Sequence, residues 1–141
     1  MREKERRQQV RTITEHVLTE TGILKGLKDI QKEELRGTAR KHALIIDFDN
    51  GRVELVWGNK FSVKGKIVGE QKPLFGDGVK DYQSIYVHVD PATMDLTIQG
   101  HWSILLSKQQ WQGNPDSVID ALTHAYLAPQ RQVSDSLVIS N

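Results

Sequence analysis

Three carboxylates, Asp47, Asp49 and Glu54, lie close together in the sequence around the dipeptide Asn50-Gly51. Asn-Gly is the strongest short signal for a β-hairpin, because both residues accept the positive φ angles of a type I′ turn. Carboxylates that face one another across a hairpin can bind a divalent cation or share a proton. The first question is therefore which side chains this turn brings face to face.

The alternation of the flanking residues predicts how the hairpin pairs. A two-residue turn places three apolar pairs on a core-facing side: Phe48 with Val53, Ile46 with Leu55, and Leu44 with Trp57. The other side carries two polar pairs, Asp47 with Glu54 and Asp49 with Arg52. A third strand over residues 61 to 68, paired with the second, adds Lys64 beside Glu54. We therefore expect cross-strand ion pairs rather than a metal site.

A second hairpin is predicted over residues 84 to 106. Its expected core positions are Ile85, Val87, Val89, Leu96, Ile98 and Trp102, and its polar positions are Tyr86, His88, Thr97, Gln99 and His101. Two imidazoles on one surface can bind a metal or transfer protons. Pairing Val89 with Leu96, however, sets His88 opposite Thr97 and His101 opposite Ser84, so a shared metal is not expected.

Basic residues are concentrated at the N-terminus, where Arg2, Lys4, Arg6, Arg7 and Arg11 outnumber Glu3 and Glu5. Clustered cations can replace counterions on phosphates, which makes a nucleic-acid-binding accessory protein one hypothesis. The segment lacks interleaved aromatic residues, so a solvated helix start is the alternative interpretation. Trp111 stands among glutamines, where it is either an anchor for a partner or a cover for the end of the core.

Composition excludes several classes of protein. The 141 residues contain no cysteine, and the formal net charge of +1 gives no global attraction to nucleic acid or anionic lipid. No complete nucleophile-elbow, Walker or dinucleotide motif is present. A charged N-terminus and the lack of a long apolar run predict a cytoplasmic protein that is not in the membrane. We expect no cofactor, no metal and no catalytic activity.

Helices are expected at both ends of the chain. Residues 3 to 36 carry the apolar stripe Val10, Ile13, Val17, Leu24 and Leu27. Gly22 makes this segment either one long helix or a helical pair, and the unbroken phase of the stripe favours one helix. The stripe is longer than a small sheet is expected to cover, which predicts self-association. A second helix is predicted to start at Asn114-Pro115 and to end before Pro129.

Two segments lack a periodic pattern. Residues 69 to 83 form the longest irregular stretch, and a loop of this kind can close over a ligand. This gives a further hypothesis, a small-ligand-binding domain or hydrolase with its site under that loop. Residues 129 to 141 are polar enough to form a flexible tail.

The sequence thus predicts one α+β domain over residues 1 to 128. It comprises a helical arm (1–37), an antiparallel sheet of about five strands (41–107) and a helix packed on the sheet (115–127). The preferred function is a non-catalytic protein-interaction module, an adaptor or assembly factor. The residues expected to contact the protein partner are Tyr86, His88, Gln99, His101 and Trp111.

Overall fold

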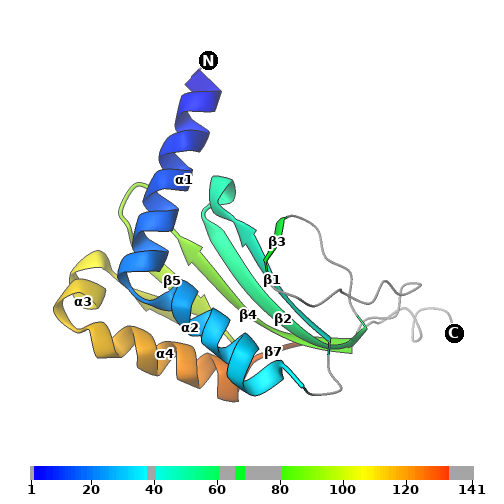
Figure 1. Ribbon diagram of the computed structural model, residues 1–141. Helices are drawn as coiled ribbons and strands as arrows, with labels where there is room; N and C mark the ends of the chain where they lie inside the picture. The colour runs from blue at the N-terminus through cyan, green and yellow to red at the C-terminus, as the bar shows by residue number, and fades with distance from the viewer. Residues whose placement is uncertain (1, 38–40, 61–65, 69–80, 134–141) are drawn as a thin grey trace, which may run out of the picture.

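One antiparallel sheet with helices packed on one of its faces makes up the protein (Figure 1). The computed structural model describes residues 2–37, 41–60, 66–68 and 81–133. The helical elements are α1 (Arg2–Glu20), α2 (Ile23–Ile30), the π-helical turn η1 (Gln31–Leu35), the 3-10 turn η2 (Phe48–Asn50), α3 (Lys108–Gly113) and α4 (Pro115–Leu127). The strands are β1 (Lys41–Asp47), β2 (Arg52–Lys60), β3 (Lys66–Val68), β4 (Asp81–Val89), β5 (Leu96–Gln99), β6 (Ser103–Leu106) and β7 (Gln130–Val133).

The sheet follows the order β3-β1-β2-β4-β5-β6, and β7 pairs with the first half of β4. The α+β class and the C-terminal helix over residues 115–127 are confirmed. The described residues form seven strands, including the three-residue β3 and the four-residue β7, where the sequence predicted about five. No helix among the described residues combines the length and the apolar character needed to cross a membrane.

The first hairpin has the predicted faces but different partners. Ile46 pairs with Val53, Leu44 with Leu55, and Asp47 with Arg52. The loop therefore contains four residues, Phe48 to Gly51, and the two-residue turn was wrong. Only Gly51 uses a positive φ, of 73°, while Asn50 donates its side-chain amide to the Asp47 carboxylate at 3.0 and 3.1 Å. Because the shift amounts to two positions, every side chain keeps its face.

The third strand differs from its prediction. β3 pairs with β1 and not with β2, and Ile67 lies opposite Ile45. The strand that pairs with the other edge of β2 is β4. The predicted neighbours Phe61 and Lys64 lie outside the described residues, as do residues 69 to 80 of the predicted loop. Residues 81 to 83 of that loop belong to β4.

The N-terminal segment is a helical pair rather than one helix. Gly22 interrupts the helix between α1 and α2. Its φ of +78° lies in the left-handed region, which glycine adopts without steric cost. The apolar stripe packs against its own chain, since Val17 and Leu27 are fully buried and Ile13 and Leu24 lie against the same core. The structure therefore removes the reason for predicting self-association through this stripe.

The second hairpin is confirmed for its first half. Val89 pairs with Leu96 and His88 with Thr97, as predicted. β5 then ends at Gln99, and β6 turns back along it, so His101 does not lie opposite Ser84. Ser84 instead pairs with Gln130 of β7. The prediction of a flexible tail is therefore wrong for Gln130–Val133, while residues 134 to 141 lie outside the described part.

The core lies between the sheet and the helices. From the sheet it takes Leu44, Leu55, Trp57, Ile85, Val87 and Ile98, and from the helices Leu18, Ile23, Leu27, Val118 and Leu122. The helical periodicity of α4 points Val118, Ala121, Leu122 and Ala125 at the sheet. These contacts leave the opposite face of the sheet for the polar residues that the sequence singled out.

Candidate functional site

The sheet face turned away from the helices, here called the polar face, holds three of the residues predicted to contact a protein partner. Antiparallel pairing places the residues of neighbouring strands in transverse rows. One row runs Ile45, Glu54, Tyr86, Gln99 and Ser103, and the next runs Asp47, Arg52, His88, Thr97 and Leu105. A third row, Ala43, Val56 and Ser84, is buried, with Ile45 and Tyr82 packed against Ala43 and Val56. The face thus joins a buried strip to a half-exposed polar surface.

The structure brings three of the five predicted partner-contacting residues together. Tyr86 and Gln99 are direct cross-strand partners, and His88 is two residues along β4 from Tyr86. His101 lies outside this face, in the exposed turn between β5 and β6. Trp111 is buried under the opposite side of the sheet and donates its indole N–H to the Met94 carbonyl at 2.9 Å. Its predicted role as a partner anchor is therefore wrong, and it covers the core.

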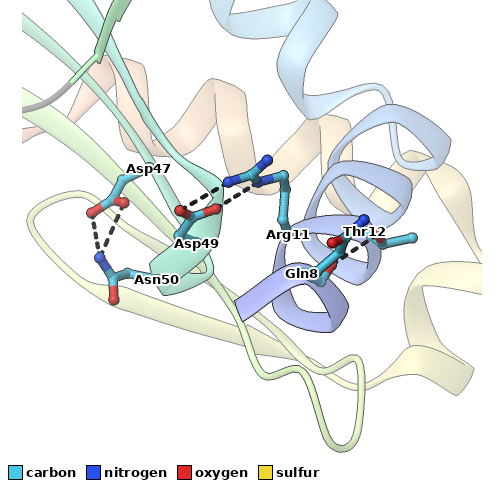
Figure 2. Close-up of polar contacts among 6 residues, drawn as sticks. All are labelled: Gln8, Arg11, Thr12, Asp47, Asp49 and Asn50. Carbon is cyan, nitrogen blue, oxygen red and sulfur yellow. Dashed lines mark hydrogen bonds and ion pairs between the residues drawn. The ribbon is translucent and has the colours of Figure 1, made fainter. Parts of the chain in front are cut away.

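The hairpin carboxylates do not converge. Asp47 accepts a hydrogen bond from Arg52 Nε at 2.9 Å. Asp49 instead points to the helical arm and accepts two hydrogen bonds from Arg11, at 2.6 and 3.1 Å (Figure 2). The predicted pairs Asp47–Glu54 and Asp49–Arg52 are wrong, because the longer loop moves both carboxylates. The Arg11 hydrogen bond lowers the pKa of Asp49 below its ordinary value. No group of three or more metal-binding side chains gathers within the described residues.

Glu54 has a different environment from the other two carboxylates. Burial raises its pKa, while a hydrogen bond from Ser84 and the charge of Arg52 lower it and only partly offset the burial. Burial, together with the neighbouring Glu54 charge, also raises the pKa of Tyr82. Arg52 in turn contacts both Asp47 and Tyr86. Glu54 is thus a half-buried carboxyl on the polar face, not the solvated member of an ion-pair ladder that the sequence predicted.

The raised pKa makes the stability of the protein depend on the charge of Glu54. A carboxyl group whose pKa is higher in the folded state stabilises the fold at low pH, and this contribution is lost as the pH rises through the folded pKa. We expect Glu54→Gln, which keeps an acceptor for Ser84, to be at least as stable as the parent at pH 7. The difference in melting temperature should shrink toward pH 4. The same change at Glu20, an exposed carboxylate of α1, is the control and should show no such trend.

The basic N-terminus forms the exposed half of α1. Arg2, Lys4, Arg6, Arg7 and Arg11 are all exposed. Arg6 pairs with Glu3, Arg7 lies 3.8 Å from Glu3, and Arg11 is held by Asp49. Three of the five cations thus face carboxylates of the same chain, which weakens the positive surface that a phosphate backbone would meet.

An exposed apolar edge was missed by the sequence prediction. β6 ends the sheet and pairs only with β5 among the described strands. Trp102, predicted to lie in the core, is 57% exposed, and Leu105 is 66% exposed. Trp102 stacks on His124 of α4, with 5.4 Å between ring centroids, and makes a T-shaped contact with His101, with 4.5 Å between ring centroids. The uncharged run Trp102 to Leu106 is the signal in the sequence that could have indicated this edge.

The turn before β6 is fastened to the end of α4. His101 donates its backbone N–H to the Ala128 carbonyl at 2.6 Å, and Gly100 donates to the Trp102 carbonyl at 3.1 Å. This anchoring fixes Trp102 at one end of β6, while Leu105 lies in the same row as Thr97 and His88. The edge of β6 and the polar face therefore form adjoining surfaces.

Comparisons of the chain with protein-family models, curated proteins and solved structures found no match.

Proposed function

We propose that this protein is a non-catalytic interaction module that binds an extended segment of a protein partner along β6. The observation that carries the proposal is the sheet edge at Ser103–Leu106, which bears the exposed side chain of Leu105 and follows directly on the exposed Trp102. An edge strand presents backbone donors and acceptors to which another strand can pair, and many recognition domains bind peptides in this way.

The chemistry of the edge supports this use. Natural sheets protect their edges with charged residues, proline or bulges, and β6 contains no charge and no proline. Tryptophan supplies much of the binding energy at protein interfaces, because it buries a large area at a small cost in side-chain entropy. Trp102 is held in place by His101 and His124, so little ordering is needed when a partner covers it.

The sheet register also determines what the partner segment would meet. A strand added beside β6 extends the existing rows, so its residues opposite Leu105 and Ser103 lie at the border of the polar face. Leu105 favours an apolar residue at the first of these positions. Gln99 and Thr97, one strand further in, offer hydrogen bonds to longer polar side chains of the partner.

Binding of peptides selected from a displayed library of random linear sequences tests this function. We expect the selected peptides to lose about tenfold or more in affinity for Trp102→Ala and for Leu105→Lys, corresponding to about 1.4 kcal/mol or more. The matched control is Ile119→Lys, which places the same charge at a site on α4 that is 59% exposed. It should change the affinity less than twofold. Bound peptide should also slow hydrogen exchange at the amides of β6.

Two results would contradict the proposal. Peptides that bind Leu105→Lys as well as the parent would place the contact elsewhere. Loss of DNA or RNA binding in an Arg6→Ala, Arg7→Ala double variant, together with a silent Leu105→Lys, would instead favour the nucleic-acid hypothesis. Such binding should weaken steeply with salt, whereas pairing along β6 should not.

A further inference from the structure

We propose that the groove between α2 and α4 is a second, independent contact surface, which binds an amphipathic helix of a protein partner with an apolar face and a basic flank. The two helices lie next to each other on the helical side of the molecule (Figure 1). The groove has a volume of about 460 Å³ and lies on the opposite side of the sheet from the polar face. It therefore shares no residue with the β6 edge.

The lining of the groove is mainly apolar. Ile23, Val118 and Leu122 form its buried floor, and Ile30, Ile119 and Tyr126 stand higher on its walls. Ile119 is 59% exposed although it lies within this lining. Solvent-exposed apolar side chains gathered around a depression are typical of surfaces that a partner covers.

Gly26 allows the two helices to lie close together. A Cβ atom at Gly26 would stand 2.7 Å from Leu122 Cδ2, so this position brings the backbone of α2 onto the side chains of α4. Gly22, the residue before α2, also lines the groove. The depression is thus bounded by two helices along its length.

The dimensions favour a helix as the occupant. Along α4 the lining runs from Val118 to Tyr126, which at a rise of about 1.5 Å per residue is a length of roughly 12 Å. This length corresponds to somewhat more than two helical turns. A third helix lying on two neighbouring helices would place apolar side chains at positions i, i+4 and i+7 into the groove.

The charged groups in the groove lining indicate which residues should flank the apolar face of that helix. The charged residues in the lining are Lys25, Asp29 and Glu34. Lys25 forms a salt bridge with Asp29 at 2.8 Å, whereas Glu34 has no ion pair within the part of the chain that the structure describes. The lining therefore has one basic and two acidic groups, with the unpaired carboxylate at the η1 end. A lysine or arginine beside the apolar face of the partner would complement Glu34.

The helical arm of a second copy does not fit this description. The exposed half of α1, from Arg2 to Gln9, contains no apolar residue that could enter the groove. Val17 and Leu18 further along α1 are fully buried in their own core. The occupant that matches the lining is thus a helix from a different protein.

Selection from a displayed library of short amphipathic helices, with counter-selection against Ile119→Lys, tests the inference. We expect enriched helices with apolar residues at i, i+4 and i+7 and with lysine or arginine on one flank. A synthetic peptide of the enriched sequence should lose tenfold or more in affinity for Ile119→Lys and threefold or more for Glu34→Gln. Leu127→Lys, on the same helix at a site 75% exposed and outside the groove, is the control and should change affinity less than twofold.

Other outcomes overturn the inference. These are an enrichment of acidic flanks, an absence of enrichment over Ile119→Lys, and amide shifts in nuclear magnetic resonance that lie outside α2 and α4. A dimer in sedimentation velocity that Ile119→Lys dissociates would show that a second copy fills the groove. A small apolar molecule that co-purifies with the parent but not with Ile119→Lys would replace the helix as the ligand. Melting curves of all variants confirm that each is folded.

Discussion

Leu55→Ala is expected to lower the free energy of unfolding by about 2–5 kcal/mol. Leu55 is fully buried in the middle of β2, with Leu44 and Ile85 as its partners on the two neighbouring strands. Alanine would remove these contacts at the central strand pair of the sheet, and the rigid backbones around it can close only part of the cavity. Equilibrium unfolding in urea, followed by circular dichroism, measures the effect.

Its control is the adjacent position on the other side of the same strand. Glu54→Gln changes a half-buried carboxyl on the polar face and removes no apolar contact from the main core. We expect it to leave stability at pH 7 unchanged or to raise it by less than about 1 kcal/mol. Equal losses for the two variants would contradict the assignment of faces in the first hairpin, because alternation gives these neighbours opposite environments.

The same hairpin shows how far the sequence could predict the fold. Alternation of apolar residues requires only that Leu44, Ile46, Val53 and Leu55 share a face, and both the predicted and the observed register satisfy it. The partners differ because the turn residues bond to groups outside the dipeptide: Asn50 to Asp47, and Asp49 to Arg11 on α1. A local signal contains no information about a helix that lies 38 residues away in the chain.

Strand order could not be predicted for a related reason. The sequence suggested that the next strand along the chain would pair with β2, yet β3 pairs with β1 and β4 occupies the free edge of β2. The free edges of β1 and β2 both offer unpaired backbone groups and apolar neighbours, so the period-two alternation of the sequence is compatible with either arrangement. Which edge is used depends on the packing of the whole sheet on its helices.

The sequence correctly predicted which site residues share a sheet face, in the strands where this depends only on the alternation of side chains. Tyr86, His88 and Gln99 share a face because they stand at alternate positions of regular strands. Trp102, predicted to lie in the core, is exposed, and Trp111, for which the sequence left open a partner anchor or a cover for the core, is buried. A strand pattern continued across Gly100 makes residue 102 an inward position, but the chain reverses at Gly100 and the alternation no longer applies.

Gly100→Ala should therefore have the second large effect, on both stability and partner binding. A Cβ atom at residue 100 would lie 2.6 Å from the Ala128 carbonyl oxygen and 2.9 Å from the Ala125 Cα. These are backbone atoms of the end of α4 and of the residue after it, so no side-chain rotation relieves the contact. We expect a loss of about 1–3 kcal/mol in unfolding free energy, the range found for overpacked sites.

The matched control is Gly113→Ala, because a Cβ atom at that glycine of α3 would have nothing within 4 Å. It should leave stability unchanged or raise it by up to about 1 kcal/mol.

If the close packing of Gly100 on α4 fixes the turn, Gly100→Ala should also weaken the hydrogen bond from His101 to Ala128 and expose the His101 amide to exchange. Trp102 would then lose its fixed place at the end of β6, so peptide affinity should fall for Gly100→Ala and not for Gly113→Ala. A stable Gly100→Ala variant with unchanged peptide binding would mean that the turn is not held by α4 and that Trp102 needs no such support.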